Sequence, residues 1–271
     1  MDLSILIVHY NTPGLLRQTL KGLRRAAPRL RYEVIVVDNN PKMRIADQVR
    51  REFPDVEVIV PETHLGFGGG MNRAIKRASG RYLFVFNPDV AVLPGALEEL
   101  VRFMDANKDV GIAGPQLLHP DGAIQASCFR FMRPEVILYR RLPWLSRIPS
   151  VKKEMDRYVM ADWDHAETRD VDYMLGAALC ARREALEKVG GFDPAFFVYF
   201  EDQDLCRRFW KAGWRVTYHP GAKLIHYHRR ETAEGGLLSQ ILNPLTRIQI
   251  RSAIYYYRKY RGEESPHVSH P

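Results

Sequence analysis

The chain has 271 residues, enough to bury a large hydrophobic core without disulfide staples. Its 40 Lys and Arg residues against 32 Asp and Glu residues give a formal net charge of +8, which favours anionic partners such as nucleotides, pyrophosphates or lipid headgroups. The basic residues are scattered and no nucleic-acid-binding signature accompanies them, so we expect no nucleic acid partner.

Cysteine usage and hydropathy suggest a compartment. Cys128, Cys180 and Cys206 are odd in number and far apart, which predicts buried thiols in a reducing environment instead of a disulfide framework or zinc site. The N-terminus lacks the basic start and long apolar region of a signal peptide, and no stretch reaches the roughly 20 apolar residues of a membrane span. We therefore expect a cytoplasmic protein, with any membrane contact being peripheral at the inner face of the cell membrane.

Short β-branched runs alternate with helical patterns in the N-terminal part of the chain. We predict strands at 5–8, 33–37, 56–60 and 82–86, and helices starting at Pro13 and covering 46–53, 71–78 and 96–104. This alternation is typical of βαβ units and a parallel sheet. Ligands bind outside the carboxyl ends of the strands in such sheets, which makes the polar turns at 9–11, 38–40 and 87–89 candidate binding segments.

After Pro115 the regular alternation ends. The turn signal at 119–122 predicts a hairpin, and residues 131–170 show no clear period, which indicates an irregular insertion. A second ordered block then follows: a strand from Val171 through Cys180, a short helix from Arg183, a turn at 190–194, and a helix from Glu201 to Lys211.

Two segments of the first half could hold a nucleotide. Asp38 follows a buried strand, where a carboxylate can accept hydrogen bonds from a nucleobase or ribose, although an Asx turn with its Asn neighbours is the alternative. The glycine-rich segment 66–72 joins a strand to a helix and would let backbone amides approach a phosphate, or it is simply a tight turn. Because Met71 stands where a dinucleotide fingerprint needs Gly or Ala, NAD binding is disfavoured.

The turn Asn87-Pro88-Asp89 places one carboxylate directly after a predicted strand. A hard cation such as Mg²⁺ or Mn²⁺ takes oxygen ligands and commonly bridges one or two carboxylates to substrate phosphates. Proline beside Asn and Asp is also an ordinary turn signal, so a plain loop is the alternative.

Acidic residues and histidines in the second half are further candidates. Residues 201–204 begin a helix after the aromatic segment 196–200; acids there are favoured by the helix dipole alone, but one carboxylate could also take a proton from an attacking hydroxyl. His226 and His228 lie on opposite faces if their segment is extended, so only one of them could join a metal or phosphate site. A structural histidine is the alternative.

Taken in chain order, these elements resemble the inverting family 2 glycosyltransferases with a GT-A fold, particularly the bacterial rhamnosyltransferase-like branch. The resemblance extends from Ser4 to about Thr232 and rests on segments 4–11, 36–39, 66–72, 86–89, 176–178, 190–193 and 200–205. It implies an α/β, Rossmann-like fold with a mostly parallel central sheet and helices on both faces. The catalytic domain would cover 1–235, with a nucleotide-sugar-binding half at 1–115 and an acceptor-binding half at 116–235, followed by a helical tail at 236–271.

The resemblance also implies roles for individual residues. Asp202 would be the catalytic base, and Asp89 with His226 would hold Mg²⁺ or Mn²⁺, with Asn87 standing where the family's Asp-X-Asp motif has its first acid. The donor nucleotide sugar would be bound by His9, Tyr10, Asn11, Asp38, Gly68, Asn72, Arg73, Asn87 and Asp89, and the acceptor by Gly176, Tyr199 and Glu201. The implied reaction moves a sugar such as rhamnose from a nucleotide-diphosphate donor to a glycan or polyprenyl-diphosphate-linked acceptor in cell-surface polysaccharide synthesis.

Two other classes of protein are the alternatives to a glycosyltransferase. A sugar-phosphate nucleotidyltransferase should carry a glycine- and arginine-rich signature after the first strand, where this chain has residues 9–13; a non-catalytic carbohydrate-binding protein is the other alternative. The helix-like segment 241–260 is basic and aromatic, so it either rests on a membrane surface near a polyprenyl-linked acceptor or packs on the catalytic domain.

Overall fold

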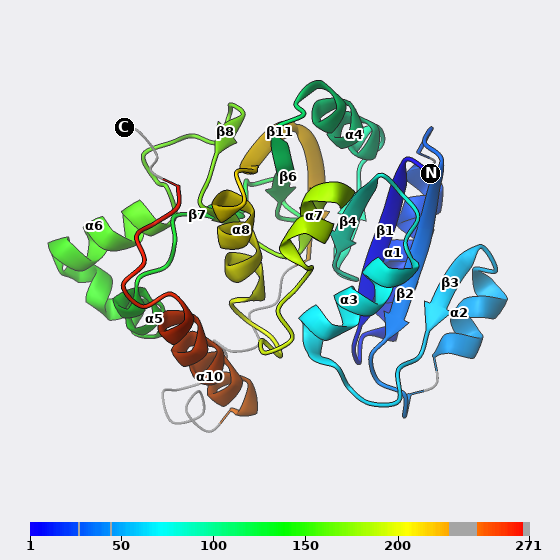
Figure 1. The fold of residues 1–271 in the computed structure, drawn as a ribbon, viewed down its shortest axis with the longest axis horizontal. Coiled ribbons are helices and arrows are strands. Elements are labelled where there is room, and N and C mark those ends of the chain that lie inside the picture. Colours follow the sequence, from blue (N-terminus) through cyan, green and yellow to red (C-terminus); the bar gives the residue numbers. More distant parts are fainter. Residues whose placement is uncertain (27, 44, 228–242, 268–271) are drawn as a thin grey trace.

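The computed structural model describes residues 1–26, 28–43, 45–227 and 243–267. A nine-stranded sheet runs through the molecule in the order β3-β2-β1-β4-β10-β6-β11-β5, and β8 pairs with β11 (Figure 1). Its strands are β1 Leu3–His9, β2 Tyr32–Asp38, β3 Val56–Ile59, β4 Tyr82–Phe86, β5 Val90–Val92, β6 Val110–Leu118, β8 Arg169–Asp170, β10 Ala178–Arg182 and β11 Arg215–His226. A second, two-stranded sheet joins β7 Cys128–Phe129 to β9 Tyr173–Met174.

Most strands of the large sheet point the same way. β3, β2, β1 and β4 pair in parallel, and β6 and β11 share their direction, whereas β10, β5 and β8 run antiparallel to their neighbours. This mixed, mostly parallel sheet confirms the predicted fold class. It is continuous across both predicted halves of the catalytic domain, whose boundaries stay a prediction.

The described helices are α1 Pro13–Ala26, α2 Ala46–Glu52, α3 Gly66–Arg77, α4 Ala96–Ala106, α5 Pro134–Arg141, α6 Pro149–Tyr158, α7 Arg183–Val189, α8 Glu201–Lys211 and α10 Pro244–Lys259, with a 3-10 turn at Pro143–Arg147. Helices α1, α2 and α4 cover one face of the sheet, while α3, α7 and α8 cover the other. Strand β1 shows the consequence, since every one of its residues is buried. A strand covered on both faces is mostly apolar, which explains why β1, β2 and β4 were predictable.

Three predictions about local structure were wrong. Residues 131–170 are not irregular: they contain α5 and α6, each with a proline in its first turn, where proline is favoured. The strand predicted from Val171 to Cys180 is two strands, β9 and β10, separated by residues 175–177. Helix α3 begins at Gly66 instead of Met71, so the glycines lie inside the helix.

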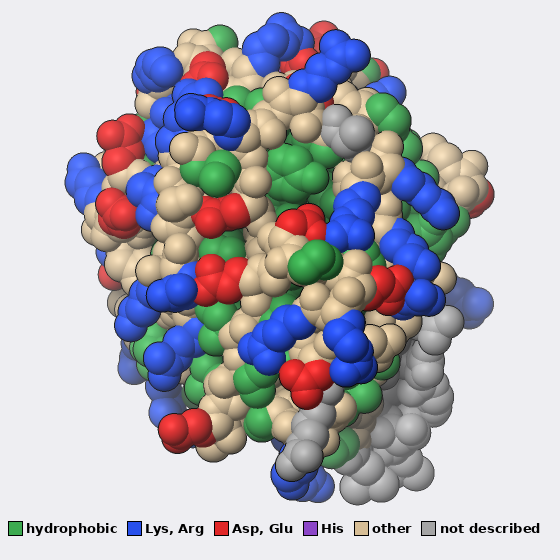
Figure 2. Space-filling view, turned by 90° about the vertical axis from the view of Figure 1, so that its right-hand side faces the viewer, with side chains coloured by type: hydrophobic (Ala, Val, Ile, Leu, Met, Phe, Trp, Pro, Cys, Tyr) green, Lys and Arg blue, Asp and Glu red, His purple; other side chains and the backbone are tan. Residues whose placement is uncertain are grey.

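The turn at 119–122 is confirmed, because Leu118 and Ile124 form an antiparallel bridge across it. The three cysteines are free and buried, as predicted. Among the described residues, no helix is long and apolar enough to cross a membrane. In Figure 2, Lys and Arg side chains are interleaved with Asp and Glu over the face shown, in agreement with the scattered basic residues of the sequence.

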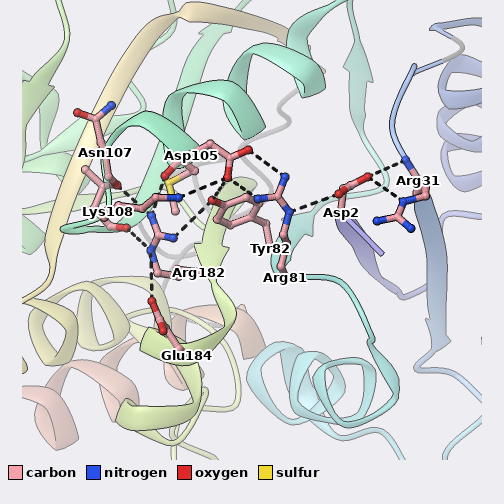
Figure 3. A network of polar contacts seen from close by, with 11 residues as sticks. Asp2, Arg31, Arg81, Tyr82, Asp105, Asn107, Lys108, Arg182 and Glu184 are labelled. Atoms are coloured by element: carbon pink, nitrogen blue, oxygen red, sulfur yellow. Dashed lines mark hydrogen bonds and ion pairs between the residues drawn. The ribbon is translucent and has the colours of Figure 1, made fainter.

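A charged network holds the amino edge of the sheet, away from the predicted ligand-binding turns (Figure 3). Arg81 pairs with Asp2 and Asp105, and the Tyr82 hydroxyl donates to Asp105 at 2.7 Å. The buried Arg182 donates to the carbonyls of Val110 (3.1 Å), Met104 (2.8 Å) and Asn107 (2.9 Å). These contacts tie β4, β10 and the end of α4 together, so this charged cluster has a structural role.

Candidate active site

Strands β1 and β2 end side by side in a buried His9–Asp38 pair. His9 Nδ1 lies 3.3 Å from Asp38 Oδ1, and the Thr12 amide donates to His9 Nε2 at 3.0 Å. Because Nε2 is an acceptor, Nδ1 carries the proton and donates to Asp38; burial lowers the pKa of His9 and favours this neutral form. Asp38 Oδ2 is buried and accepts no hydrogen bond from any residue described. The pair therefore offers one oriented carboxylate oxygen at the carboxyl end of β2.

An aromatic row lies at the rim beside this pair. The Tyr10 side chain is 47% exposed, its ring centroid is 4.2 Å from that of His64, and His64 is 4.7 Å from Phe197. Asn11 adopts a left-handed conformation (φ 57°) and its side chain accepts from Asn40 at 2.7 Å. The row joins the turn after β1 to the segment before α8. Sequence reasoning missed His64, which carries no local motif.

The glycines of α3 let another segment approach the helix closely. Gly66 has φ 71°, and a Cβ there would lie 2.2 Å from the Phe197 carbonyl oxygen, to which the Phe67 amide donates at 2.8 Å. Gly68 faces Phe192 in the same way, with a Cβ contact of 3.1 Å. The Gly66 amide, the first of this helix, donates to His64 Nδ1 at 2.9 Å, so the first two amides of α3 are both used within the protein. The glycines therefore have a packing function. A donor contact at Gly68 stays a prediction.

Two further predicted donor residues lie on α3. Both amide atoms of Asn72 bond the backbone of Phe192, donating to its carbonyl at 2.8 Å and accepting from its amide at 2.9 Å. Asn72 therefore fixes the turn at 190–194 against α3. Arg73, the next residue of the same helix, is exposed to solvent.

The Asn87-Pro88-Asp89 turn connects β4 to β5 and meets the end of β11. The register pairs His226 with Val90, which places His226 Nε2 3.4 Å from Asp89 Oδ1. His226 Nδ1 lies 2.7 Å from Gln125 Oε1, an arrangement that fixes the ring orientation. Asp89 Oδ1 is buried and accepts no hydrogen bond from the described part of the chain. His228 lies outside the described residues.

This pair of side chains suits a divalent cation that keeps other ligands. Within residues 1–26, 28–43, 45–227 and 243–267 there is no group of three or more His, Cys, Asp or Glu side chains able to hold a metal. Asp89 and His226 would supply two ligands, which is the arrangement expected where waters and substrate phosphates complete the coordination of Mg²⁺ or Mn²⁺.

Helix α8 starts with Glu201 and Asp202 directly after a strained turn. Tyr199 and Phe200 both have positive φ, at 70° and 68°, a conformation that L residues rarely adopt. Asp202 Oδ2 accepts from the Gly176 amide at 3.1 Å, and Oδ1 accepts from the Gln203 amide at 2.8 Å. Burial raises the pKa of Asp202, and these two hydrogen bonds oppose the rise.

Glu201 is 7% exposed, and burial together with the neighbouring Asp202 raises its pKa to about 8. Its Oε2 atom accepts no hydrogen bond from the residues that the structure describes. Two adjacent carboxyl groups thus start α8 in different environments. Asp202 is held by backbone amides, whereas burial and the neighbouring carboxylate favour the protonated form of Glu201 by raising its pKa.

The loop between β9 and β10 brings the two predicted functional turns together. Gly176 donates to Asp202, and the carbonyl of the next residue, Ala177, accepts from the Asn87 amide at 2.9 Å. A Cβ on Gly176 would lie 3.3 Å from that of Asp202, so glycine permits this close approach. The Asn87–Asp89 turn and Asp202 are therefore attached to neighbouring residues of one loop.

A mostly parallel α/β sheet with polar turns at its carboxyl edge, a carboxylate–histidine pair and a nearby buried acid defines a nucleotide-sugar transferase of the GT-A type. The chain belongs to glycosyl transferase family 2, whose model matches residues 4–144, and a second model, glycosyl transferase family group 2, matches 88–243. It is therefore a nucleotide-sugar-dependent glycosyltransferase. This assignment favours transfer over the nucleotidyltransferase and non-catalytic alternatives.

Two curated rhamnosyltransferases are similar to this chain over most of their length. The chain is 27% identical over 251 residues to an N-acetylglucosaminyl-diphospho-decaprenol L-rhamnosyltransferase of Mycobacterium tuberculosis, covering 85% of this chain and 77% of the relative. It is 25% identical to rhamnosyltransferase WbbL of Escherichia coli, covering 82% of each chain.

Solved structures share the fold at low sequence identity. GalNAc-T7 crystallised with UDP, GalNAc and Mn²⁺ superposes with a TM-score of 0.65 at 15% identity, covering 99% of this chain and 52% of that one. The chain thus spans about half of that protein. A mannosyltransferase from Pyrobaculum calidifontis in complex with GDP-Man and Mn²⁺ has a TM-score of 0.57 at 16% identity, covering 98% and 76%.

Proposed function

We propose that the protein transfers a sugar, with rhamnose as the first candidate, from a nucleotide-diphosphate donor to a polyprenyl-diphosphate-linked glycan acceptor. The names of the Mycobacterium tuberculosis and Escherichia coli relatives support this choice of sugar and acceptor. One observation supports the proposal: the loop at 176–177 bonds both Asp202, the proposed base, and Asn87, in the proposed metal-binding turn. Cell-surface polysaccharide synthesis is the process that uses such acceptors.

The donor would bind across the carboxyl edge of β1, β2 and β4. The free oxygen of Asp38 suits a nucleobase or ribose donor group, and Tyr10 with Asn11 would cover the nucleoside at the rim. Arg73 would reach the diphosphate, which agrees with its exposed position on α3. Gly68, Asn72 and Asn87 would shape this side of the site through the packing described above.

Asp89 and His226 would hold Mg²⁺ or Mn²⁺. The buried Oδ1 of Asp89 without a hydrogen-bond donor, 3.4 Å from His226 Nε2, supports this assignment. The ion would supply positive charge against the diphosphate leaving group. Asn87 in place of a second carboxylate leaves the protein contribution at one negative charge.

Asp202 would be the catalytic base. It would accept the proton of an acceptor hydroxyl as that oxygen attacks the anomeric carbon in line with the departing nucleoside diphosphate, and a single displacement inverts the configuration. Its bonds to the Gly176 and Gln203 amides orient the carboxylate and oppose the rise in its pKa that burial causes. Tyr199 and Glu201, with Gly176, would form the acceptor side of the site, where the protonated Glu201 can donate a hydrogen bond.

The acceptor suggests a peripheral contact with the membrane. Helix α10 exposes Ile250 and Ile254, one turn apart and 47% and 48% exposed, together with Arg247 and Arg251. Apolar and basic residues on one exposed helix suit an anionic lipid surface. Sedimentation with liposomes should increase with anionic lipid and fall in Ile250→Ser; binding that ignores lipid charge would reject this contact.

The donor is identified with a panel of nucleotide sugars, and the roles of Asp202 and Asp89 are then tested by substitution. Thermal shift with UDP-, GDP- and dTDP-sugars in Mn²⁺ identifies the donor, since a ligand of the native state raises its apparent stability. With that donor and a short-chain polyprenyl-diphospho-N-acetylglucosamine, Asp202→Asn should lower turnover on the order of 10³-fold and leave donor affinity unchanged. Asp89→Ala should instead abolish the metal-dependent part of donor binding in calorimetry.

Either assignment can be refuted separately. A folded Asp202→Asn variant with near-wild-type turnover would remove Asp202 from the mechanism. Donor affinity is measured for wild type and Asp89→Ala, once with Mn²⁺ and once with EDTA. If the two proteins bind the donor equally well in both conditions, Asp89 does not bind the metal.

A further inference from the structure

Helix α10 packs on the segment that leads into α8. It contributes Ala253 and Tyr256, with Tyr260 just after its end, to a small apolar cluster that includes Phe196 and Phe200. Figure 1 shows α10 close to α5 and below α8. The C-terminal helix thus covers the residues directly before Glu201 and Asp202, at the start of α8.

The strained turn before α8 is bonded to this helix. Tyr199 and Phe200 lie in the left-handed region, and such conformations persist only where the surrounding structure holds them. The buried Ser252 hydroxyl donates to the Val198 carbonyl at 2.9 Å, and the Phe200 ring lies 5.4 Å from that of Tyr256. These contacts come from α10, which is distant from the turn in sequence.

A second set of contacts reaches the first turn of α8 itself. Asp204 is fully buried, and its Oδ1 accepts from Lys259 Nζ at 2.6 Å and from the Tyr260 hydroxyl at 2.7 Å. Its other oxygen accepts from Arg208 within α8 at 2.8 Å. Lys259 Nζ also lies 2.6 Å from Asp193 Oδ2, in the turn that follows α7. One ammonium group therefore connects α10, α8 and the 190–194 turn.

We infer that α10 positions the catalytic base, with Lys259 as the central positioning residue. Asp202 and Asp204 share the first turn of α8, so a contact that fixes Asp204 also fixes the direction of Asp202 toward the Gly176 amide. A buried carboxylate needs bonded partners, so loss of Lys259 favours movement of this turn toward water. The inference rests on the proposal that Asp202 is the base.

The test compares neighbouring residues of α10. Lys259→Met removes the ammonium group, and Arg258→Met removes a positive charge from the exposed side of the helix one residue earlier. Ser252→Ala removes only the hydroxyl that bonds Val198. Turnover is measured with the donor selected in the thermal-shift panel and the short-chain acceptor, and calorimetry gives the affinity for the same donor nucleotide with Mn²⁺.

We expect Lys259→Met to lower kcat by about 10- to 100-fold, since misplacement of a catalytic group by about 1 Å costs up to roughly 10²-fold. Nucleotide affinity should stay within twofold of wild type, and Arg258→Met should match wild type in both. The acid limb of the pH–kcat profile should move to higher pH in Lys259→Met, because a weakened bond from Gly176 no longer lowers the pKa of Asp202.

Several outcomes would overturn the inference. Wild-type kcat and an unmoved acid limb in folded Lys259→Met would do so, as would equal losses in Lys259→Met and Arg258→Met. If Lys259→Met does not fold, Ser252→Ala carries the test, and wild-type kcat in that variant rejects the positioning role. Asp202→Asn measured in parallel separates the two levels: an active Asp202→Asn refutes the base, whereas an inactive one with fully active α10 variants refutes only the positioning role.

Discussion

Gly66→Ala is the substitution whose effect the structure defines most sharply. Gly66 begins α3 with φ 71°, and an added Cβ would lie 2.2 Å from the carbonyl oxygen of Phe197. The contact atom belongs to the backbone, so no side-chain rotation relieves it. Either α3 or the segment before α8 must move.

The cost has two parts. A left-handed conformation costs an L residue roughly 1–2 kcal/mol. Separating the two segments also breaks the bond from the Phe67 amide to the Phe197 carbonyl, 2.8 Å long, for a further net loss of about 0.5–1.5 kcal/mol. We expect the free energy of unfolding to fall by about 1.5–3.5 kcal/mol in total.

Urea unfolding followed by circular dichroism measures this change, with Gly22→Ala as the matched control. Gly22 lies inside α1 and a Cβ there would meet nothing within 4 Å, so that variant should gain up to about 1 kcal/mol from helix propensity. If Gly66→Ala unfolds at the same urea concentration as Gly22→Ala, the close approach of Phe197 to α3 is refuted.

Two further predictions concern buried charges. Arg182→Met should lower the free energy of unfolding by about 3 kcal/mol, since it removes a donor from the buried carbonyls of Met104 and Val110 and one of two donors from the partly buried carbonyl of Asn107. Calorimetry should show unchanged affinity for the donor nucleotide, and a loss of stability below about 1 kcal/mol would contradict the network of Figure 3. Glu201→Gln should change the pH dependence of stability. Folding raises the pKa of Glu201 from 4.5 to about 8, so the folded state binds the proton more tightly than the unfolded state. The free energy of unfolding of the wild type should therefore fall as the pH rises from about 4.5 to 8. Urea titrations at several pH values should show this fall reduced in the variant, and parallel curves would refute the raised pKa.

The parts of the fold that the sequence predicted correctly are those encoded locally. The apolar runs of β1, β2 and β4 are buried on both faces, so their composition alone marks them as central parallel strands. Helix α8 was also predicted over its full length, because acids gather in its first turn and Gly213 follows its end.

The misplaced start of α3 shows why local signals fail where packing decides. Gly66, Gly68 and Gly70 each lower helix propensity by about 1 kcal/mol, so sequence reasoning placed the helix start after them. The space that a side chain would need at these glycines is occupied by Phe197, Phe192 and Val8, which are distant in the sequence. No periodicity in segment 66–72 carries that information.

The candidate site divides along the same line. The residue types were predictable: a carboxylate at the end of β2, a carboxylate in the turn after β4, and acids at the start of α8. Their relationships were not, because Gly176 and Asp202 are 26 residues apart and meet only when α8 packs on the sheet. His64 was missed for the same reason, since its position between Tyr10 and Phe197 depends on two other segments.

This dependence explains why strain and close packing gather around Asp202. A base at a helix N-terminus is stabilised as the carboxylate by the helix itself, which would lower its pKa and weaken it as a proton acceptor. Burial beside Glu201 raises the pKa again, but a buried carboxylate keeps its place only if its partners are rigid. The left-handed Tyr199–Phe200 turn aims Asp202 at the Gly176 amide, and the bonds from Ser252 and Lys259 of α10 hold that turn and the helix behind it. On the proposal that Asp202 is the base, the C-terminal helix α10 acts as a positioning element of the active site, even though none of its described residues carries a family motif.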